Sequence, residues 1–294
     1  MFDRFIESTA AAGIALHCAE ISFHGKTVLK RCFSEDKCYP VYSATKSVTS
    51  AAVLMAQGEG RLDISDKLYK YLDKKYSDIV PDPFRALTFR DFMTMTSAPY
   101  PFRPQEVSSL IEEPNEADWL ENILRLPVDY SDRGFHYSNI PAYLVSAACE
   151  NAVGMPLAEY LRPRLFEPLG WGRPVYQTSP EGHFYGATGM ELTVSQLARL
   201  GQLLMQEGSW HGEQLIPKEL VREAATARVN TGKGGYGYFL WVNDNTFAIS
   251  GKWGQRCVVC PEKELIVTYL SHQPERSGEL ADLAQRFIDE FQEV

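Results

Sequence analysis

Two serine–lysine pairs with the same spacing stand near the start of the sequence, Ser34 with Lys37 in "SEDK" and Ser43 with Lys46 in "SATK". A serine attacks a carbonyl carbon when a base takes its proton, and an uncharged lysine can be that base. "SEDK" has two acidic residues between its ends and runs into "CYP", which predicts an exposed turn. "SATK" opens a segment with helical periodicity, so the second pair is the one that could do chemistry.

The pair of Ser43 and Lys46 has two interpretations. Residues three apart at a helix start lie on neighbouring faces, and the free N–H groups there favour negative charge, which suits an activated serine. Against this, serine is a favoured N-cap, lysine is usually solvated, and such a pair arises by chance about once in a few hundred residues. Taken alone, the pair does not establish catalysis.

Two further motifs follow later in the chain. "FHYSN" holds the only Tyr-x-Asn, Tyr137 and Asn139, although a turn whose asparagine bonds its own backbone would look the same. "SGKWG" puts Lys252 and Gly254 on a predicted late strand, with Gln255 next, although a lysine on an edge strand also limits aggregation.

The elements that would position these residues can be read from the hydrophobic pattern. Residues 13–33 predict a hairpin, and the segment from residue 43 predicts a helix to residue 57, with Gly58 as a left-handed cap. Helix-patterned segments fill the middle, and strands return with "YGYFLWV", "NTFAISGKWG" and "RCVVCPEKELIVTYLS" before a closing helix. We therefore expect one domain over 1–294, with a sheet lobe from about 1–60 plus 190–294 and a helical lobe over about 61–189.

The order Ser-x-x-Lys, Tyr-x-Asn, Lys-x-Gly resembles that of the penicillin-recognising serine hydrolases. The chain looks like the class C β-lactamase branch and its relatives among serine esterases and D-amino-acid peptidases. Segments such as "GRLDISDKLYKYL" and "GATGMELTVSQLARLGQLLMQEG" extend the resemblance over nearly the whole chain. It implies a β-lactamase-like fold of the α/β (α+β) class, with an antiparallel sheet flanked by helices, an inserted mostly helical lobe, and the site in the cleft between the lobes.

The same resemblance implies roles for the motif residues. Ser43 would form the acyl-enzyme, while Lys46 and Tyr137 exchange its proton. Because free lysine and tyrosine titrate near pH 10, proximity and burial must bring one pKa down toward neutrality. Lys252 would favour the tyrosine phenolate.

The remaining motif residues would handle the substrate. The backbone N–H groups of Ser43 and Gln255 would form the oxyanion hole, and Asn139 would orient the substrate or the lysine amine. Gly254 completes the third motif, and the resemblance implies no metal or organic cofactor.

Trp253 departs from the family pattern, because the β-lactamases of this family usually have threonine at that position. The hydroxyl that binds a substrate carboxylate is then absent, which favours an ester or small amide over a penicillin. β-Lactamase, D-alanyl or D-amino-acid peptidase and nylon-oligomer-type amidase activities stay open, as does a non-catalytic sensor or binding protein.

Composition narrows the partners and the compartment. A net charge of -9 and a pI near 5.3 oppose nucleic-acid binding, and no stretch is long and apolar enough to span a membrane. Asp3 and Glu7 argue against a secretory leader, which predicts a cytoplasmic protein if Met1 is the natural start. The six cysteines are expected to be free thiols in a reducing compartment. The expected partner is a small-molecule substrate, and the oligomeric state stays open.

Overall fold

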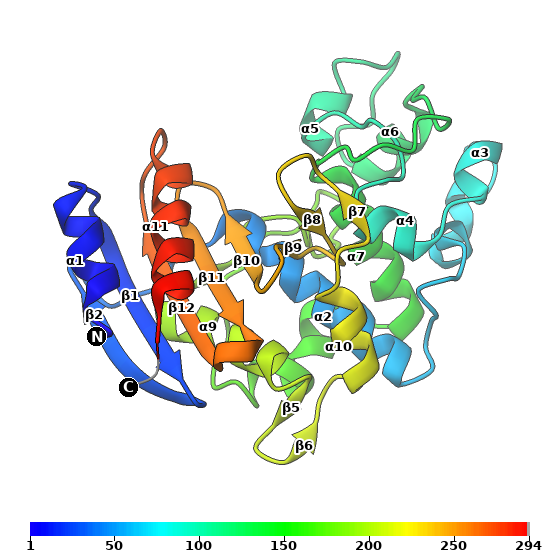
Figure 1. Cartoon of the computed structure of the whole chain (residues 1–294). Coiled ribbons are helices and arrows are strands. Elements are labelled where there is room, and N and C mark those ends of the chain that lie inside the picture. The colour runs from blue at the N-terminus through cyan, green and yellow to red at the C-terminus, as the bar shows by residue number, and fades with distance from the viewer. Residues whose placement is uncertain (293–294) are drawn as a thin grey trace.

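A computed structural model, which describes residues 1–292, shows an antiparallel sheet beside a group of helices (Figure 1). The eight strands of the sheet run, from edge to edge, β2 (Lys26–Cys32), β1 (Leu16–Phe23), β12 (Leu265–Ser271), β11 (Gln255–Cys260), β10 (Phe247–Gly251), β9 (Trp241–Val242), β8 (Gly235–Tyr236) and β7 (Val229–Asn230). Every neighbouring pair is antiparallel. The predicted mixed class with an antiparallel sheet is confirmed.

The two ends of the chain meet in the sheet. β1 pairs with β12, so that Leu16 lies opposite Ser271 and Phe23 opposite Leu265. β1 also pairs with β2, which confirms the predicted hairpin. The first and last strands are therefore direct neighbours although most of the sequence separates them.

Helices cover both faces of the sheet. α1 (Arg4–Ala11) and α11 (Ser277–Glu290) pack together over one face, and α9 (Val194–Met205) packs on the other (Figure 1). All seven residues of β12 are buried, because alternate side chains such as Val267 and Ile266 enter two different cores. The sequence pattern did not predict α1.

The helical side is centred on α2 (Thr45–Gly58) and α7 (Ile140–Val153), which pack against each other and are mostly buried. Around them lie α3 (Asp82–Arg85), α4 (Phe89–Met93), α5 (Pro104–Val107), α6 (Trp119–Arg125), α8 (Leu157–Leu161) and α10 (Lys218–Ala224). Two small ribbons pair β3 (Tyr39–Pro40) with β4 (Glu191–Leu192) and β5 (Ser209–Trp210) with β6 (Glu213–Gln214). The division into lobes near residues 60 and 190 stays a prediction.

Three local predictions were wrong. Gly58 is still helical, and the left-handed residue that follows α2 is Gly60, with φ of 69°. "YGYFLWV" forms the two strands β8 and β9 instead of one, because the chain turns between them with Phe239 at φ of 57°. Lys252 lies in the turn between β10 and β11 instead of on a strand.

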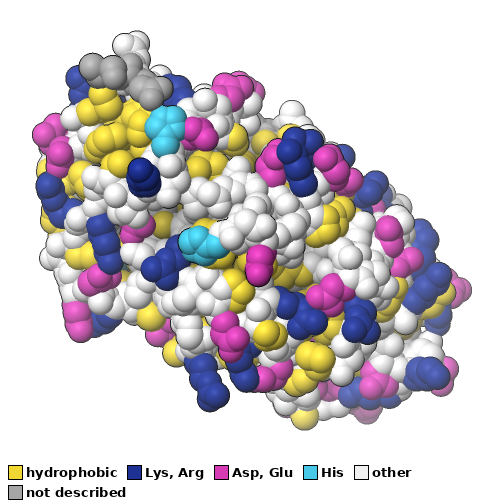
Figure 2. Space-filling view, turned by 90° about the horizontal axis from the view of Figure 1, so that it is seen from below, with side chains coloured by type: hydrophobic (Ala, Val, Ile, Leu, Met, Phe, Trp, Pro, Cys, Tyr) yellow, Lys and Arg dark blue, Asp and Glu magenta, His cyan; other side chains and the backbone are white. Residues whose placement is uncertain are grey.

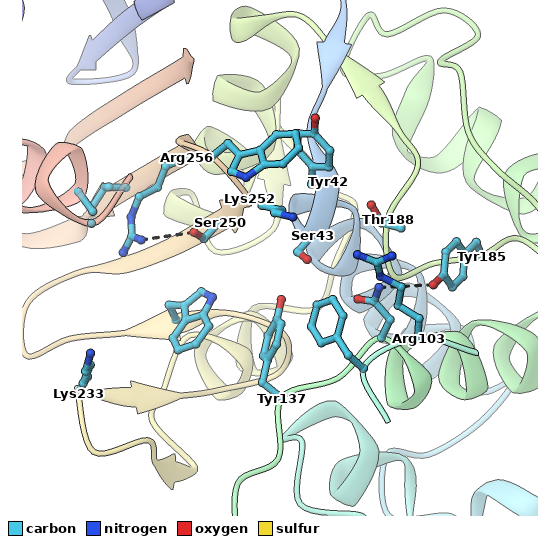
Figure 3. Close-up of a pocket in the computed structure, with 18 of the residues that line it drawn as sticks. Tyr42, Ser43, Arg103, Tyr137, Tyr185, Thr188, Lys233, Ser250, Lys252 and Arg256 are labelled. Atoms are coloured by element: carbon cyan, nitrogen blue, oxygen red, sulfur yellow. Dashed lines mark hydrogen bonds between the residues drawn. The ribbon is translucent and has the colours of Figure 1, made fainter. Parts of the chain in front are cut away.

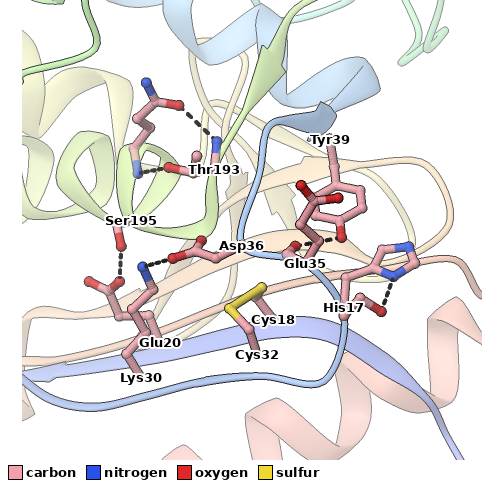
Figure 4. The surroundings of a disulfide bond; sticks show 12 residues. His17, Cys18, Glu20, Lys30, Cys32, Glu35, Asp36, Tyr39, Thr193 and Ser195 are labelled. Carbon is pink, nitrogen blue, oxygen red and sulfur yellow. Dashed lines mark hydrogen bonds and ion pairs between the residues drawn. A yellow bond between two sulfur atoms is a disulfide. The ribbon is translucent and has the colours of Figure 1, made fainter.

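The cysteine prediction was wrong for two of the six residues. Cys18 and Cys32 lie directly opposite each other on β1 and β2, with Cα atoms 4.0 Å apart, and form a disulfide (Figure 4). Cys38 is an exposed free thiol, and the other three, Cys149, Cys257 and Cys260, are buried free thiols. The "CVVC" segment lies in β11, as expected.

Charge is mixed on the face shown in Figure 2, where acidic and basic side chains alternate over the surface. None of the helices formed by the described residues is long and apolar enough to cross a membrane.

Candidate active site

Ser43 lies in a turn of 3-10 helix, η1 (Tyr42–Ala44), that leads directly into α2. The residue before it, Tyr42, has φ of 48°, a conformation that costs energy in a residue other than glycine and that recurs at functional sites. Neither η1 nor α2 has a side-chain cap, so the Ser43 hydroxyl does not serve as an N-cap. The structure thus places the half-buried serine at the helix start with its hydroxyl free for other contacts.

Lys46 lies one turn further along α2, with only 1% of its surface exposed. Its Nζ donates to Ser43 Oγ at 3.1 Å, to Asn139 Oδ1 at 2.6 Å and to the Ala187 carbonyl oxygen at 2.9 Å. All three acceptors are neutral, so nothing offsets the cost of burying a charge, and burial lowers the pKa of Lys46 to about 7. A lysine with that pKa is partly uncharged at neutral pH and can accept the serine proton.

The loop that carries Ala187 is fixed against α2. Thr49 Oγ1 donates to the Gly186 carbonyl oxygen at 2.8 Å, and the Thr45 hydroxyl accepts from the Met190 N–H at 3.3 Å. At Gly186, φ is 67° and an added Cβ would lie 2.5 Å from Ser146 Cβ, so only glycine fits. No side-chain motif predicts this contact, because its acceptor is a backbone carbonyl; the closely spaced glycines of "GATG" are the available signal in the sequence.

Tyr137 lies just before α7 and lines the cleft. Its hydroxyl hydrogen-bonds Ser43, and Lys46 Nζ is 5.0 Å from the ring centroid. Burial raises the pKa of Tyr137 to about 12, and the opposing effect of the Ser43 hydrogen bond is smaller. The tyrosine is therefore protonated at neutral pH. The pKa that burial brings toward neutrality is that of the lysine, and the role of Lys252 beside the tyrosine stays a prediction.

Asn139 connects the lysine to the cleft wall. Its Oδ1 accepts from Lys46, and its Nδ2 donates to the Tyr185 hydroxyl at 3.4 Å. Two partners of different kinds fix which end of the amide faces the lysine. Tyr185 gave no signal in the sequence that set it apart from the other tyrosines.

The third motif forms the opposite wall. Lys252 is exposed, and its Nζ lies 4.3 Å from the ring centroid of Trp253. Trp253 has φ of 65° and contacts Tyr42 and His272, with ring centroids 5.1 Å and 4.6 Å away. In Figure 3, Lys252 and Tyr137 approach Ser43 from two sides of the same cleft.

Gly254 and Gln255 lie behind this wall and are buried. At Gly254, φ is 89° and an added Cβ would lie 2.3 Å from Ser271 Oγ. The Gln255 side chain donates to the Ser271 carbonyl oxygen and accepts from its N–H at 3.3 Å, which anchors the start of β11. The left-handed Gly254 and the anchored side chain of Gln255 thus shape the turn, and the oxyanion role of the Gln255 N–H stays a prediction.

The cleft has a volume of about 1330 Å³ and brings together five of the predicted residues, Ser43, Tyr137, Asn139, Lys252 and Trp253. Aromatic and cationic side chains that the sequence did not single out complete its lining, among them Tyr42, Phe102, Arg103, Tyr185, Trp241 and Arg256. Within residues 1–292, the one group with metal-ligand spacing is Cys18, Cys32 and Asp36, and the disulfide occupies two of these ligands. It lies outside the cleft.

A serine in contact with a buried amine and a protonated phenol, in a cleft lined in part by aromatic side chains, is an arrangement suited to acyl transfer. The profile of the Beta-lactamase family matches residues 2–290, and the chain belongs to that family of serine hydrolases. The fold and the recognition made from the three motifs are thereby confirmed.

Known proteins resemble the chain at low sequence identity. "Putative D-alanyl-D-alanine carboxypeptidase" of Escherichia coli K12 is 22% identical over 303 aligned positions, which cover 80% of this chain and 69% of that protein. The protein of the same name from Salmonella gallinarum is 26% identical over 153 residues, 49% of this chain and only 35% of that protein. The structure of a D-stereospecific amidohydrolase from Streptomyces has a TM-score of 0.69 at 18% identity and covers 96% of this chain and 97% of its own. That identity shows a shared fold.

Proposed function

We propose that the protein hydrolyses a carboxylic ester or a small amide through an acyl-enzyme on Ser43. The observation that carries this proposal is the contact of 3.1 Å between Ser43 Oγ and the amine of Lys46, whose pKa burial lowers to about 7. A buried lysine with neutral partners is a base at physiological pH, and the serine is the acidic group beside it.

In the proposed acylation, uncharged Lys46 takes the hydroxyl proton as Ser43 Oγ bonds to the substrate carbonyl carbon. The backbone N–H groups of Ser43 and Gln255 stabilise the negative charge on the carbonyl oxygen. As the tetrahedral intermediate collapses, the bond to the leaving group breaks and that group takes a proton. Tyr137 delivers it from its hydroxyl, and the phenolate then regains a proton that comes from the Lys46 ammonium.

Deacylation uses the same groups. A water molecule replaces the leaving group, loses its proton to the lysine and attacks the acyl carbon, and Ser43 recovers its hydrogen. Asn139 holds the Lys46 amine in place through both halves of the cycle, because it accepts a hydrogen bond of 2.6 Å from Nζ.

D-Amino-acid peptidase activity is the second candidate. The printed names of the Escherichia coli and Streptomyces relatives favour it. Trp253 weighs against a β-lactam or a terminal carboxylate at the usual position, because it lacks the hydroxyl of the threonine that β-lactamases usually carry there and its ring packs against Tyr42.

The test compares wild type with Ser43→Ala on p-nitrophenyl butyrate and on a chromogenic cephalosporin, with intact mass recorded for each. Ser43-dependent ester turnover with little cephalosporin cleavage supports the proposal, and the reverse supports a β-lactamase. If neither reagent is turned over or leaves an acyl group on Ser43, the ester proposal is wrong, and D-alanyl peptides become the next substrates.

The expected cytoplasmic location also remains a proposal. The Cys18–Cys32 disulfide points the other way, because structural disulfides persist in oxidising compartments. Counting free thiols by mass spectrometry in protein alkylated at the moment of cell lysis tests it: a cytoplasmic, reduced protein carries six alkyl groups, whereas the disulfide form carries four.

A further inference from the structure

We propose that Arg256 forms an anion subsite in the cleft and that the substrate carries a carboxylate that binds there. This inference rests on the proposed function, because it assigns a substrate class to the same cleft. Arg256 follows Gln255 on β11, and since successive side chains of a strand point to opposite faces, the arginine faces the cleft while the glutamine is anchored to Ser271.

The guanidinium of Arg256 has only one hydrogen-bond partner among the described residues, the hydroxyl of Ser250, which accepts from Nη1 at 3.3 Å (Figure 3). Its Nε is buried without a partner. No carboxylate from residues 1–292 lies within 4.0 Å of its charged nitrogens. A half-buried cation with a single neutral partner is costly, and a carboxylate delivered by the substrate would offset that cost.

A second arginine of the same cleft provides the contrast. Arg103 Nε lies 3.9 Å from Glu106 Oε1, so its charge already has a counterion. Figure 3 shows Arg103 on one side of Ser43 and Arg256 on the other. The cleft therefore has one cation that is paired and one that is not.

The surroundings of Arg256 keep the subsite positive. Lys233 and Lys252 line the same cleft, and no carboxylate described in the structure pairs with either of them. Asp282, exposed on α11, is the one acidic lining residue on this side, and it makes no ion pair with the guanidinium. Three cations thus face one carboxylate in a protein whose net charge is -9. A planar guanidinium favours the planar, two-oxygen geometry of a carboxylate.

The experiment uses two matched pairs of chromogenic esters. The acyl pair is mono-p-nitrophenyl adipate and its methyl ester; the leaving-group pair is 4-butanoyloxy-3-nitrobenzoate and its methyl ester. For each pair, the ratio of kcat/KM for the charged ester to that for the neutral ester is measured in wild type, Arg256→Gln and Arg256→Lys. Arg286→Gln is the control, because Arg286 lies on α11 outside the cleft.

We expect that Arg256→Gln lowers this ratio by about tenfold to a hundredfold in one pair, since hydrogen bonds to charged groups contribute that much. Arg256→Lys should lose less, the control should match wild type, and the wild-type preference should weaken with salt. A change of less than about twofold in both pairs would overturn the proposal, because removing a charge-assisted contact cannot leave both ratios intact.

Equilibrium binding of adipate to Ser43→Ala protein separates this proposal from the ester hydrolase itself. Weaker binding after the additional change Arg256→Gln supports the subsite even if no ester is turned over. If Ser43→Ala protein binds adipate equally well with and without Arg256→Gln, the subsite is contradicted. Ser43-dependent hydrolysis of the neutral esters would in that case still support the proposed function.

Discussion

The two Ser-x-x-Lys pairs have the same spacing and opposite environments. Lys37 is exposed, and its Nζ lies 3.0 Å from Glu35 Oε2, a hydrogen-bonded contact that raises the pKa of the lysine. Lys46 is buried among neutral acceptors, and burial lowers its pKa to about 7. One lysine is thus held charged by a neighbouring carboxylate, and the other is partly uncharged because it has none.

This difference shows that spacing alone does not define a catalytic pair. In "SEDK" the residues between serine and lysine are acidic, whereas in "SATK" they are small and allow the helix to pack tightly. The surroundings of the lysine therefore decide whether it can act as a base.

The largest expected effect separates the two serines. Ser43→Ala should lower kcat for the p-nitrophenyl ester by at least about 10⁴-fold, since the nucleophile is lost. Ser34→Ala, at the same position of the other pair, should stay within about twofold of wild type, because exposed substitutions rarely matter. Equal effects of the two changes would remove Ser43 from the mechanism.

The second largest loss of activity is expected for Tyr137→Phe. It keeps the ring but removes the hydroxyl that hydrogen-bonds Ser43, so kcat should fall by about 10² to 10⁴-fold. Tyr176→Phe, at a tyrosine with 39% of its surface exposed, is the control, and circular dichroism checks the fold of both. Near-wild-type turnover by Tyr137→Phe would show that proton transfer does not pass through the phenol.

The pH dependence tests the lysine. Because the protonated amine cannot act as a base, the rate of acylation should rise with pH through a pKa of about 7 and fall about tenfold per pH unit below it. Lys37→Ala should leave this profile unchanged. A rate that does not change between pH 5 and 8, measured by single-turnover burst kinetics, would contradict a neutral Lys46.

The lowered pKa of Lys46 also makes the free energy of unfolding depend on pH, and the direction of that dependence can be predicted. Between about pH 7 and 10.5 the unfolded chain binds a proton on Lys46 that the native protein has lost. The free energy of unfolding should therefore receive a contribution from this group that increases with pH across that window. Urea titrations of wild type and Lys46→Met at pH 7 and 9 measure this contribution. If the free energy of unfolding changes equally with pH in the two proteins, the lowered pKa of Lys46 is contradicted.

The smallest effect is expected at the third motif. Trp253→Thr removes the ring packed on Tyr42 and restores a hydroxyl, so the ratio of cephalosporin acylation to ester hydrolysis should increase by about tenfold. Trp210→Thr, outside the cleft, is the comparison. An unchanged ratio would show that Trp253 does not block a carboxylate position.

The motif residues and the fold class were within reach of the sequence, because their spacing and the hydrophobic pattern are local properties. What the sequence could not supply was the environment. The Ala187 carbonyl, which lies 141 residues after Lys46, and the Tyr185 hydroxyl reach the site from the same loop, and no motif of the sequence marks them. The disulfide, by contrast, was within reach of a local pattern, because the predicted hairpin brings Cys18 and Cys32 face to face; a chain of this length does not need a disulfide to fold, so none was expected.

The pairing of β1 with β12 has a consequence for synthesis on the ribosome. β1 and β2 are translated first, yet the neighbour that completes their hydrogen bonding follows only at Leu265–Ser271. Until then the inner edge of the nascent hairpin is an open template for other chains, and such non-local pairing is slow. The sheet should thus be completed only once Leu265–Ser271 has left the ribosome, and a chain stalled before residue 265 should be captured by chaperones that bind exposed strand edges.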